Sequence, residues 1–153
     1  MKIDIHGHFV DPHYLDDAGD RVRGGYDITL EAFISSEKMR RDGMAPFRLT
    51  HTSFATIYWT VAQMLAHHTS NGCNLEIGDL IGSGTVSGPE RSSWGSLLEL
   101  TARGSEPIEL PSGEKRGFIE DGDEIIFRGF CSKAGYPRIG FGECRGVIMP
   151  ARS

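Results

Sequence analysis

The alternation of apolar and polar positions predicts that most of this chain forms β-strands. From Tyr26 to Ile34 every second residue is apolar, which is the period of a half-buried strand. Turn signals at Pro111-Ser112-Gly113 and Asp121-Gly122-Asp123 separate further apolar runs in the second half. Four runs are expected to be short strands: 80–81, 97–101, 117–119 and 124–127. The pattern favours an α+β fold, mainly β, with an antiparallel, sandwich-like or roll-like sheet.

One prominent helix interrupts this pattern, over about residues 53–70. Apolar side chains recur there at helical spacing, and Thr52-Ser53 offers candidate N-caps. Asn71-Gly72 marks the end of the helix, because both residue types tolerate the left-handed backbone that closes many helices. We expect the helix to bury one face, with His68 on that face and His67 beside it.

Composition and charge describe an ordinary globular domain and exclude several classes of protein. The 153 residues, 39% apolar and 24% charged, are enough for one domain with its own core. The net charge of −5 argues against nucleic-acid binding, and no apolar run is long enough to cross a membrane. Three cysteines without metal-binding spacing, and the lack of a visible signal peptide, favour a cytoplasmic protein.

Two positions are candidates for binding or catalysis. Thr85 lies within the glycine-rich segment 82–90, whose small residues allow backbone N–H groups and hydroxyls to approach a ligand closely. This segment lacks the lysine and the glycine spacing of a phosphate-binding loop, so a tight irregular turn is the alternative interpretation. Glu99 stands among leucines in a predicted strand, where a buried carboxylate requires a partner or a function. Strand alternation offers the alternative that Glu99 points outward.

Metal binding is a weaker hypothesis at three places. Asp121–Glu124 lacks the ligand ladder of a calcium loop, which favours a hairpin turn. His67 and His68, as neighbours on a helix, diverge by about 100° and cannot readily share one ion. His6 and His8 resemble the first-strand metal motif of amidohydrolase-type barrels, but no repeated βα units follow them.

An ordered series of segments gives the chain a resemblance to a known family. The segments follow one another without large gaps, and such an ordered set is far more specific than any single motif. From about Tyr14 to Ala151 the chain resembles the C-terminal portion of the fumarylacetoacetase family. The segments that carry the resemblance are Tyr58-Trp59-Thr60, His67–Leu75, Gly78-Asp79-Leu80, Ser83–Glu90, Gly95–Leu100, Asp121–Glu124 and Gly140–Cys144.

The resemblance implies a fold, a reaction and the roles of two residues. It implies a β-roll or sandwich over residues 14–153, behind an unrelated leader at 1–13, and a homodimer in the complete enzyme. The implied reaction is hydrolysis of a carbon–carbon bond in fumarylacetoacetate, the last step of tyrosine and phenylalanine breakdown, supported by Mg²⁺ or Ca²⁺. By the same resemblance, Glu99 matches the glutamate that orients a general-base histidine, and Thr85 matches a substrate-binding threonine.

The family's other active-site residues have no counterpart in the matched region. Its carboxylate metal ligands and its base histidine lie upstream in the family pattern, so we expect no metal ligand in this chain. We therefore expect a chain of hydrolase descent that is catalytically incomplete on its own. Two alternatives stay open: a non-catalytic β-rich module for dimerisation or for pairing with a separate N-terminal half, and an amidohydrolase-like metal site at His6 and His8.

Overall fold

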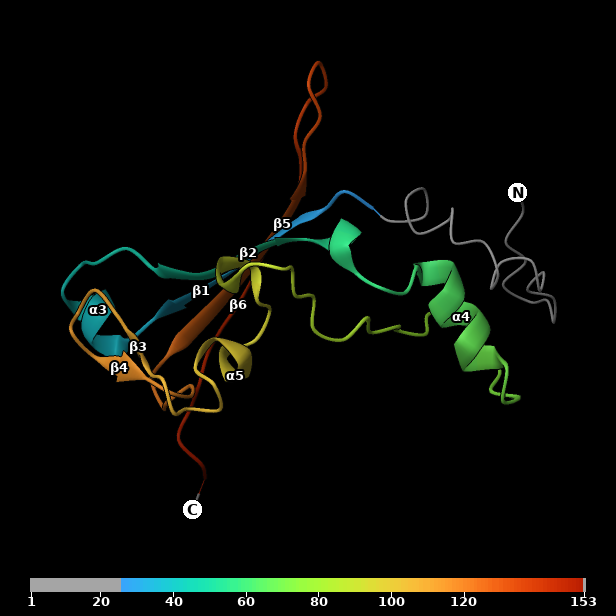
Figure 1. The fold of residues 1–153 in the computed structure, drawn as a ribbon. Helices are drawn as coiled ribbons and strands as arrows, with labels where there is room; N and C mark the ends of the chain where they lie inside the picture. Colours follow the sequence, from blue (N-terminus) through green and yellow to red (C-terminus); the bar gives the residue numbers. More distant parts are fainter. Residues whose placement is uncertain (1–25, 153) are drawn as a thin grey trace. The chain divides into compact units, whose positions relative to one another are not determined.

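Four antiparallel strands form the main sheet of the protein, in the order β2-β1-β5-β6 (Figure 1). The computed structural model describes residues 26–152. The turn expected at Pro111-Ser112-Gly113 is confirmed, and it joins the two strands of a small second sheet. The strands are β1 (Thr29–Ser35), β2 (Phe47–Ser53), β5 (Glu124–Cys131) and β6 (Ile139–Val147) in the main sheet, and β3 (Ile108–Glu109) and β4 (Lys115–Arg116) in the small one.

Within residues 26–152 the helices are few and short. The α-helices are α3 (Glu37–Arg41), α4 (Val61–Thr69) and α5 (Leu97–Leu100), and two single 3-10 turns occur at η1 (Phe54–Thr56) and η2 (Arg91–Ser93). The fold is thus a mixed α+β arrangement built mostly from strands, which agrees with the fold class that the sequence predicts. Within residues 26–152, no helix combines the length and apolar character that crossing a bilayer requires.

The described residues divide into two units. The helical unit contains Ile57–Gly84 and therefore α4. The sheet unit combines Asp27–Thr56 with the chain from Thr85 onward, and it holds both sheets, α3 and α5. Both candidate site residues, Thr85 and Glu99, thus belong to the sheet unit.

The strand expected at Tyr26–Ile34 is confirmed from Thr29 onward as β1, whereas residues 26–28 form no strand. This strand lies in the middle of the main sheet between β2 and β5. Its residue Ile34 is fully buried and forms the core with Met39 of α3 and Leu110. Burial of one such side chain contributes about 1.5–3 kcal/mol to stability. The partly buried side chains packed against this core are Phe47, Leu49, Ile108 and Ile125.

The predicted start of the long helix is wrong, because Thr60 rather than Thr52-Ser53 is the N-cap of α4. Thr60 Oγ1 accepts a hydrogen bond from the Gln63 backbone N–H (3.3 Å), and Gln63 Oε1 accepts one from the Thr60 backbone N–H (2.9 Å). This reciprocal capping satisfies donors that the first helical turn leaves unpaired. Thr52-Ser53 instead ends β2, where pairing with β1 holds the backbone extended.

The buried face of α4 also differs from the expectation. Gln63 and Ala66 are its buried residues, whereas His67 and His68 are exposed. Because the helix covers only Val61–Thr69, both histidines fall in its last turn. The expected stop is confirmed by Gly72, which has a φ of +83° and donates its N–H to the Thr69 carbonyl (3.0 Å).

Of the four short strands expected in the second half, only 124–127 is confirmed, as part of β5. Residues 80–81 and 117–119 form no strand, and Leu97–Leu100 is the helix α5. The helix forms because Ser96 Oγ caps it, accepting a hydrogen bond from the Glu99 backbone N–H (3.2 Å). This local capping signal outweighs the strand-like run of leucines.

The strand β6 was not predicted from the sequence. Its glycines at positions 140, 142 and 146 interrupt the apolar alternation that indicates a strand. Pairing along β5 supplies what the local pattern lacks, with Phe127 opposite Cys144 and Glu124 opposite Val147.

The turn at Asp121-Gly122-Asp123 connects β4 and β5, which belong to different sheets, so it is not the expected hairpin.

The last residue of this turn, Asp123, forms a buried ion pair with Arg116. Asp123 is 1% exposed and accepts two hydrogen bonds from Arg116, from Nε (2.9 Å) and from Nη2 (3.1 Å). Glu114 and Glu120 also pair with this guanidinium, each at 3.2 Å. The hydrogen bonds and charge of Asp123 hold the pKa of Arg116 above its usual value.

Glu114 makes the stability of the sheet unit depend on acidic pH. Hydrogen bonds from Ser112 (2.6 Å) and Ser36, with a smaller contribution from Arg116, lower the pKa of Glu114 from 4.5 to about 2. A carboxyl group with a lowered pKa in the folded state stabilises it fully above the unfolded-state pKa, and this stabilisation is lost as the pH falls toward the folded-state pKa.

We therefore expect the free energy of unfolding to fall between pH 4.5 and pH 2 partly through Glu114. Urea titrations of the wild type and of Glu114→Gln across this range measure the effect. The wild type is expected to be the more stable protein at pH 6, with the difference narrowing toward pH 2. A difference that stays constant with pH contradicts this assignment.

Candidate active site

The segment from Thr85 to Glu99, here called the Thr85–Glu99 loop, contains both candidate residues, and serine hydroxyl groups within it bind Glu99. Ser87 Oγ donates a hydrogen bond to Glu99 Oε2 (2.7 Å), and Ser96 Oγ donates to the same oxygen (3.1 Å). Glu99 lies in the first turn of α5, and its side chain is exposed, as is Thr85. Two hydroxyl groups therefore hold the Glu99 carboxylate in place at the surface of the sheet unit.

Gly95 closes this loop by a close backbone approach. A Cβ atom at Gly95 would lie 2.2 Å from the Val86 carbonyl oxygen and 2.9 Å from Thr85 Cγ2. The Gly95 backbone N–H donates to Ser87 Oγ (3.0 Å), and Ser87 in turn donates to Glu99. Only a residue without a side chain fits between Val86 and Ser87 at position 95. Gly95 therefore lies against Thr85 on one side and is linked to Glu99 through Ser87 on the other.

Gly95→Ala is expected to destabilise the sheet unit by about 1–3 kcal/mol, because the added methyl group meets backbone atoms that must move. Urea unfolding measures the change. Gly146→Ala in β6 is the matched control, since a Cβ there has no atom within 4 Å. Equal free energies of unfolding for the two variants contradict the close approach at Gly95.

The arrangement provides a carboxylate whose position is fixed through one of its two oxygens. Both hydrogen bonds from serine go to Glu99 Oε2, and within residues 26–152 no hydrogen bond to Oε1 is found. A carboxylate held through one oxygen can accept a hydrogen bond from an imidazole through the other, which fixes the orientation of a general base. Among the described side chains, no histidine fills that position.

The sequence proposes Thr85 and Glu99 as site candidates but did not single out Ser87 and Ser96, which bind Glu99, or Gly95, which lies against Thr85. The signal for Ser96 was present as Ser-x-x-Glu at 96–99, the pattern of a helix N-cap. No local pattern marks Ser87 or Gly95, because their contacts form only when the loop folds back on itself.

The described residues do not form a site for Mg²⁺ or Ca²⁺. Across residues 26–152, no group of three or more His, Cys, Asp or Glu side chains is placed to hold a metal ion. Asp123 is paired with Arg116, which rules out the calcium-loop interpretation of Asp121–Glu124. His6 and His8 lie outside the described residues.

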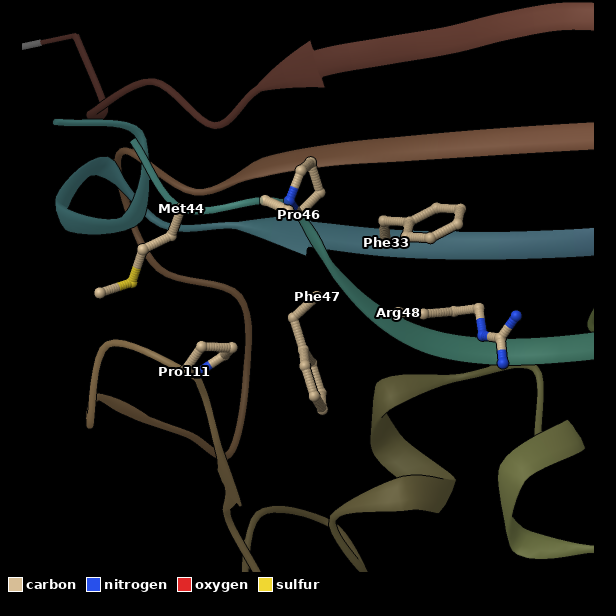
Figure 2. A pocket seen from close by; sticks show the side chains of 7 residues that line it. Phe33, Met44, Pro46, Phe47, Arg48 and Pro111 are labelled. Atoms are coloured by element: carbon tan, nitrogen blue, oxygen red, sulfur yellow. The ribbon is translucent and has the colours of Figure 1, made fainter. Parts of the chain in front are cut away.

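A shallow hollow of about 590 Å³ lies near the last residues of β1 and the first residues of β2 (Figure 2). It contains neither Thr85 nor Glu99, and its one charged residue, Arg48, is paired with Glu31 (3.1 Å). Figure 2 shows Phe33 and Arg48 on the two neighbouring strands. The lining side chains are Phe33, Met44, Ala45, Pro46, Phe47, Arg48 and Pro111. This hollow is therefore separate from the candidate site.

Comparison with known proteins decides the family. The model of the fumarylacetoacetate (FAA) hydrolase C-terminal family matches residues 36–149, which include the whole Thr85–Glu99 loop. The chain belongs to this family. The resemblance that the ordered segments indicate is thereby confirmed, and it places the chain among relatives of a hydrolase.

Several fumarylacetoacetases are close relatives of this family member. The Dictyostelium discoideum fumarylacetoacetase is 45% identical over 140 residues, which cover 90% of the chain and 31% of that protein. The Homo sapiens fumarylacetoacetase is 46% identical over 126 residues, 82% of the chain and 29% of that protein. The Caenorhabditis elegans fumarylacetoacetase is 58% identical over 100 residues, 65% of the chain and 23% of that protein. The chain thus spans less than a third of the length of these relatives.

Proposed function

We propose that this chain supplies part of the active site of a fumarylacetoacetase. The reaction would be hydrolytic cleavage of a carbon–carbon bond in fumarylacetoacetate, giving fumarate and acetoacetate, at the end of tyrosine and phenylalanine breakdown. The observation that carries the proposal is the Thr85–Glu99 loop, in which Ser87 and Ser96 fix the Glu99 carboxylate within the family match. The high identity to proteins named fumarylacetoacetase supports the choice of substrate.

Glu99 is proposed to orient the histidine that activates water. Its Oε2 is held by Ser87 (2.7 Å) and Ser96 (3.1 Å), so its Oε1 can accept a hydrogen bond from an imidazole N–H. A carboxylate in this position also stabilises the imidazolium that forms when the histidine takes a proton from water. The histidine itself is proposed to come from the part of the relatives that this chain does not match.

Thr85 is proposed to bind the substrate through its hydroxyl group. Thr85 is exposed and lies at the start of the loop, where its side chain packs against Gly95. A hydroxyl can donate a hydrogen bond to a ketone or carboxylate oxygen of the β-diketo acid.

Further features of the complete enzyme are proposals of the same kind. We propose a β-roll or sandwich over 14–153, separate from a leader at 1–13, a homodimer, and a cytoplasmic location. The resemblance also implies Mg²⁺ or Ca²⁺. Because the described side chains do not fit a metal, we assign its ligands to the unmatched part of the relatives and assign no step to it here.

Reconstitution tests this function directly. The chain, residues 1–153, is assayed with fumarylacetoacetate, with and without Mg²⁺ or Ca²⁺, and the loss of substrate absorbance is followed. The same assay is repeated after co-expression with the part of the human relative that lies N-terminal to its 126 matched residues. We expect no turnover from the chain alone and metal-dependent turnover from the co-expressed pair. Robust turnover by the chain alone contradicts its proposed incompleteness, and a pair that assembles without any turnover contradicts the proposed function.

A further inference from the structure

Two exposed asparagines follow α4, and they differ in the residue that comes next. Asn71 and Asn74 are the only asparagines of the chain, and both belong to the helical unit. Asn71 precedes Gly72, whereas Asn74 precedes Leu75. The amide carbon of an asparagine can be attacked by the backbone nitrogen of the following residue, and a side chain on that residue hinders the attack. The segment therefore holds one asparagine with an open path to this reaction and one with an obstructed path.

Gly72 leaves its backbone nitrogen accessible from the side that Asn71 would approach. Among the described residues, no atom lies within 4 Å of the position that a Cβ at Gly72 would occupy. The Gly72 N–H donates one hydrogen bond, to the Thr69 carbonyl in the last turn of α4 (3.0 Å). Helix ends fray at little cost, because only the contacts of the last turn have to open. The nitrogen is thus released whenever the end of α4 opens.

The side-chain amide of Asn71 is held in a way that favours attack on its carbon. Asn71 Oδ1 accepts a hydrogen bond from the Cys73 backbone N–H (3.2 Å). This donor draws electron density from Cγ and meets the oxygen where negative charge develops during the attack. Within residues 26–152, no hydrogen bond of Asn71 Nδ2 is found, so this nitrogen can leave as ammonia. The exposure of both Asn71 and Gly72 gives water access to the product.

We propose that Asn71 is a site of spontaneous deamidation through a cyclic imide with Gly72. The Gly72 nitrogen bonds to Asn71 Cγ and loses its proton, while the bond from Cγ to Nδ2 breaks and ammonia leaves. Water then opens the imide at one of its two carbonyl groups, which gives aspartate or isoaspartate at position 71. The sum of the steps consumes one water and releases one ammonia, so no oxidant or reductant is required. The proposal is independent of the proposed hydrolase function.

The modification changes the end of α4 in two ways. It adds one negative charge to a chain of net charge −5, beside helix carbonyl groups that already carry partial negative charge. A negative charge at the C-terminus of a helix destabilises its last turn. In the isoaspartate product the backbone also runs through the former side chain, which displaces the Gly72 N–H from the Thr69 carbonyl. Deamidation is therefore expected to loosen the end of α4 as the protein ages.

Peptide mapping of the aged chain tests the proposal, with Asn74 as the reference inside the same molecule. The purified chain, residues 1–153, is incubated at mildly alkaline pH, sampled over time and digested at acidic pH, which suppresses the reaction during handling. Mass spectrometry assigns each conversion to position 71 or 74. We expect position 71 to convert at least about tenfold faster than Asn74, because Gly72 has no side chain to obstruct the attack. The product should contain isoaspartate as well as aspartate, since an imide opens at either carbonyl.

A matched pair of variants links the chemistry to the change in charge. Ion-exchange chromatography of the aged wild type should separate a species with one more negative charge. Asn71→Gln should abolish this species and Asn74→Gln should keep it, and both positions are exposed, so neither change should alter stability by more than about 0.5 kcal/mol.

Four results overturn the proposal. Equal rates of conversion at the two asparagines show that Gly72 provides no advantage. An acidic species that persists in Asn71→Gln assigns the change to another residue. Aspartate without isoaspartate shows direct hydrolysis rather than a cyclic imide. Conversion of Asn71 that occurs in urea but not in the folded chain shows that the end of α4 protects the site instead of exposing it.

Discussion

Glu99→Gln in the reconstituted hydrolase is expected to lower kcat by about 10²–10⁴-fold, the range that general acid–base catalysis contributes. Glutamine keeps the size of the side chain and can still accept the hydrogen bonds from Ser87 and Ser96. It cannot stabilise a positively charged imidazolium, so the histidine that it orients becomes a weaker base. KM should change little, because the substrate contact assigned to Thr85 remains.

The pH profile separates this positioning role from a merely structural one. A neighbouring carboxylate raises the pKa of an imidazole, so its removal should move the acidic limb of kcat/KM to lower pH. Glu109→Gln is the matched control, because Glu109 is an exposed glutamate on β3, away from the loop. Glu99→Gln should leave the free energy of unfolding of the chain nearly unchanged. Activity within about twofold of the wild type contradicts the role assigned to Glu99.

Asp123→Ala is expected to destabilise the sheet unit by about 3–5 kcal/mol, the cost of removing one partner from a buried ion pair. Asp123 is 1% exposed and binds Arg116 through both carboxylate oxygens, while the Glu120 backbone N–H donates to Asp123 Oδ2 (2.9 Å). Its loss leaves a buried guanidinium with weaker partners and an unpaired backbone donor. Domains of this size are stable by only about 5–15 kcal/mol, so the change is a large share of the total.

Urea unfolding at pH 7 measures this loss, with Asp121→Ala as the control from the same turn. Asp121 is exposed and should change stability by about 0.5 kcal/mol or less. The double variant Arg116→Met/Asp123→Ala should recover part of the loss, because it removes the unpaired charge. A single variant as stable as the Asp121→Ala control contradicts a structural role for this pair.

The sequence predicted the features that depend on neighbouring residues. The alternation from Tyr26 to Ile34 became β1, and Pro111-Ser112-Gly113 and Gly72 mark a turn and a helix end as expected. In each case the residue types within a few positions form the pattern that indicates the structure, so the local sequence contains the information. The family assignment from ordered motifs succeeded for a similar reason, since it depends only on residue order.

Errors concentrate where contacts between distant segments oppose the local pattern. Thr52-Ser53 has the composition of an N-cap, yet pairing with β1 extends it and moves the cap to Thr60. The glycines of β6 weaken its signal, and pairing with β5 holds it as a strand. Leu97–Leu100 is an exception, because here the error was made at the level of the local pattern. The N-cap signal at Ser96 was present in the sequence, but the prediction gave more weight to the run of leucines.

For the candidate site, the sequence by itself selected two candidate residues, Thr85 and Glu99, and indicated the family to which the chain belongs. The tertiary structure decided how the carboxylate is held, through Ser87 and Gly95, and that Asp123 serves a buried arginine rather than a metal. It also decided that Phe127 and Phe141 on the main sheet are more than half exposed. The physical reason is the same in each case: a residue's type sets what it can bind, but only the packing of distant segments sets what it meets.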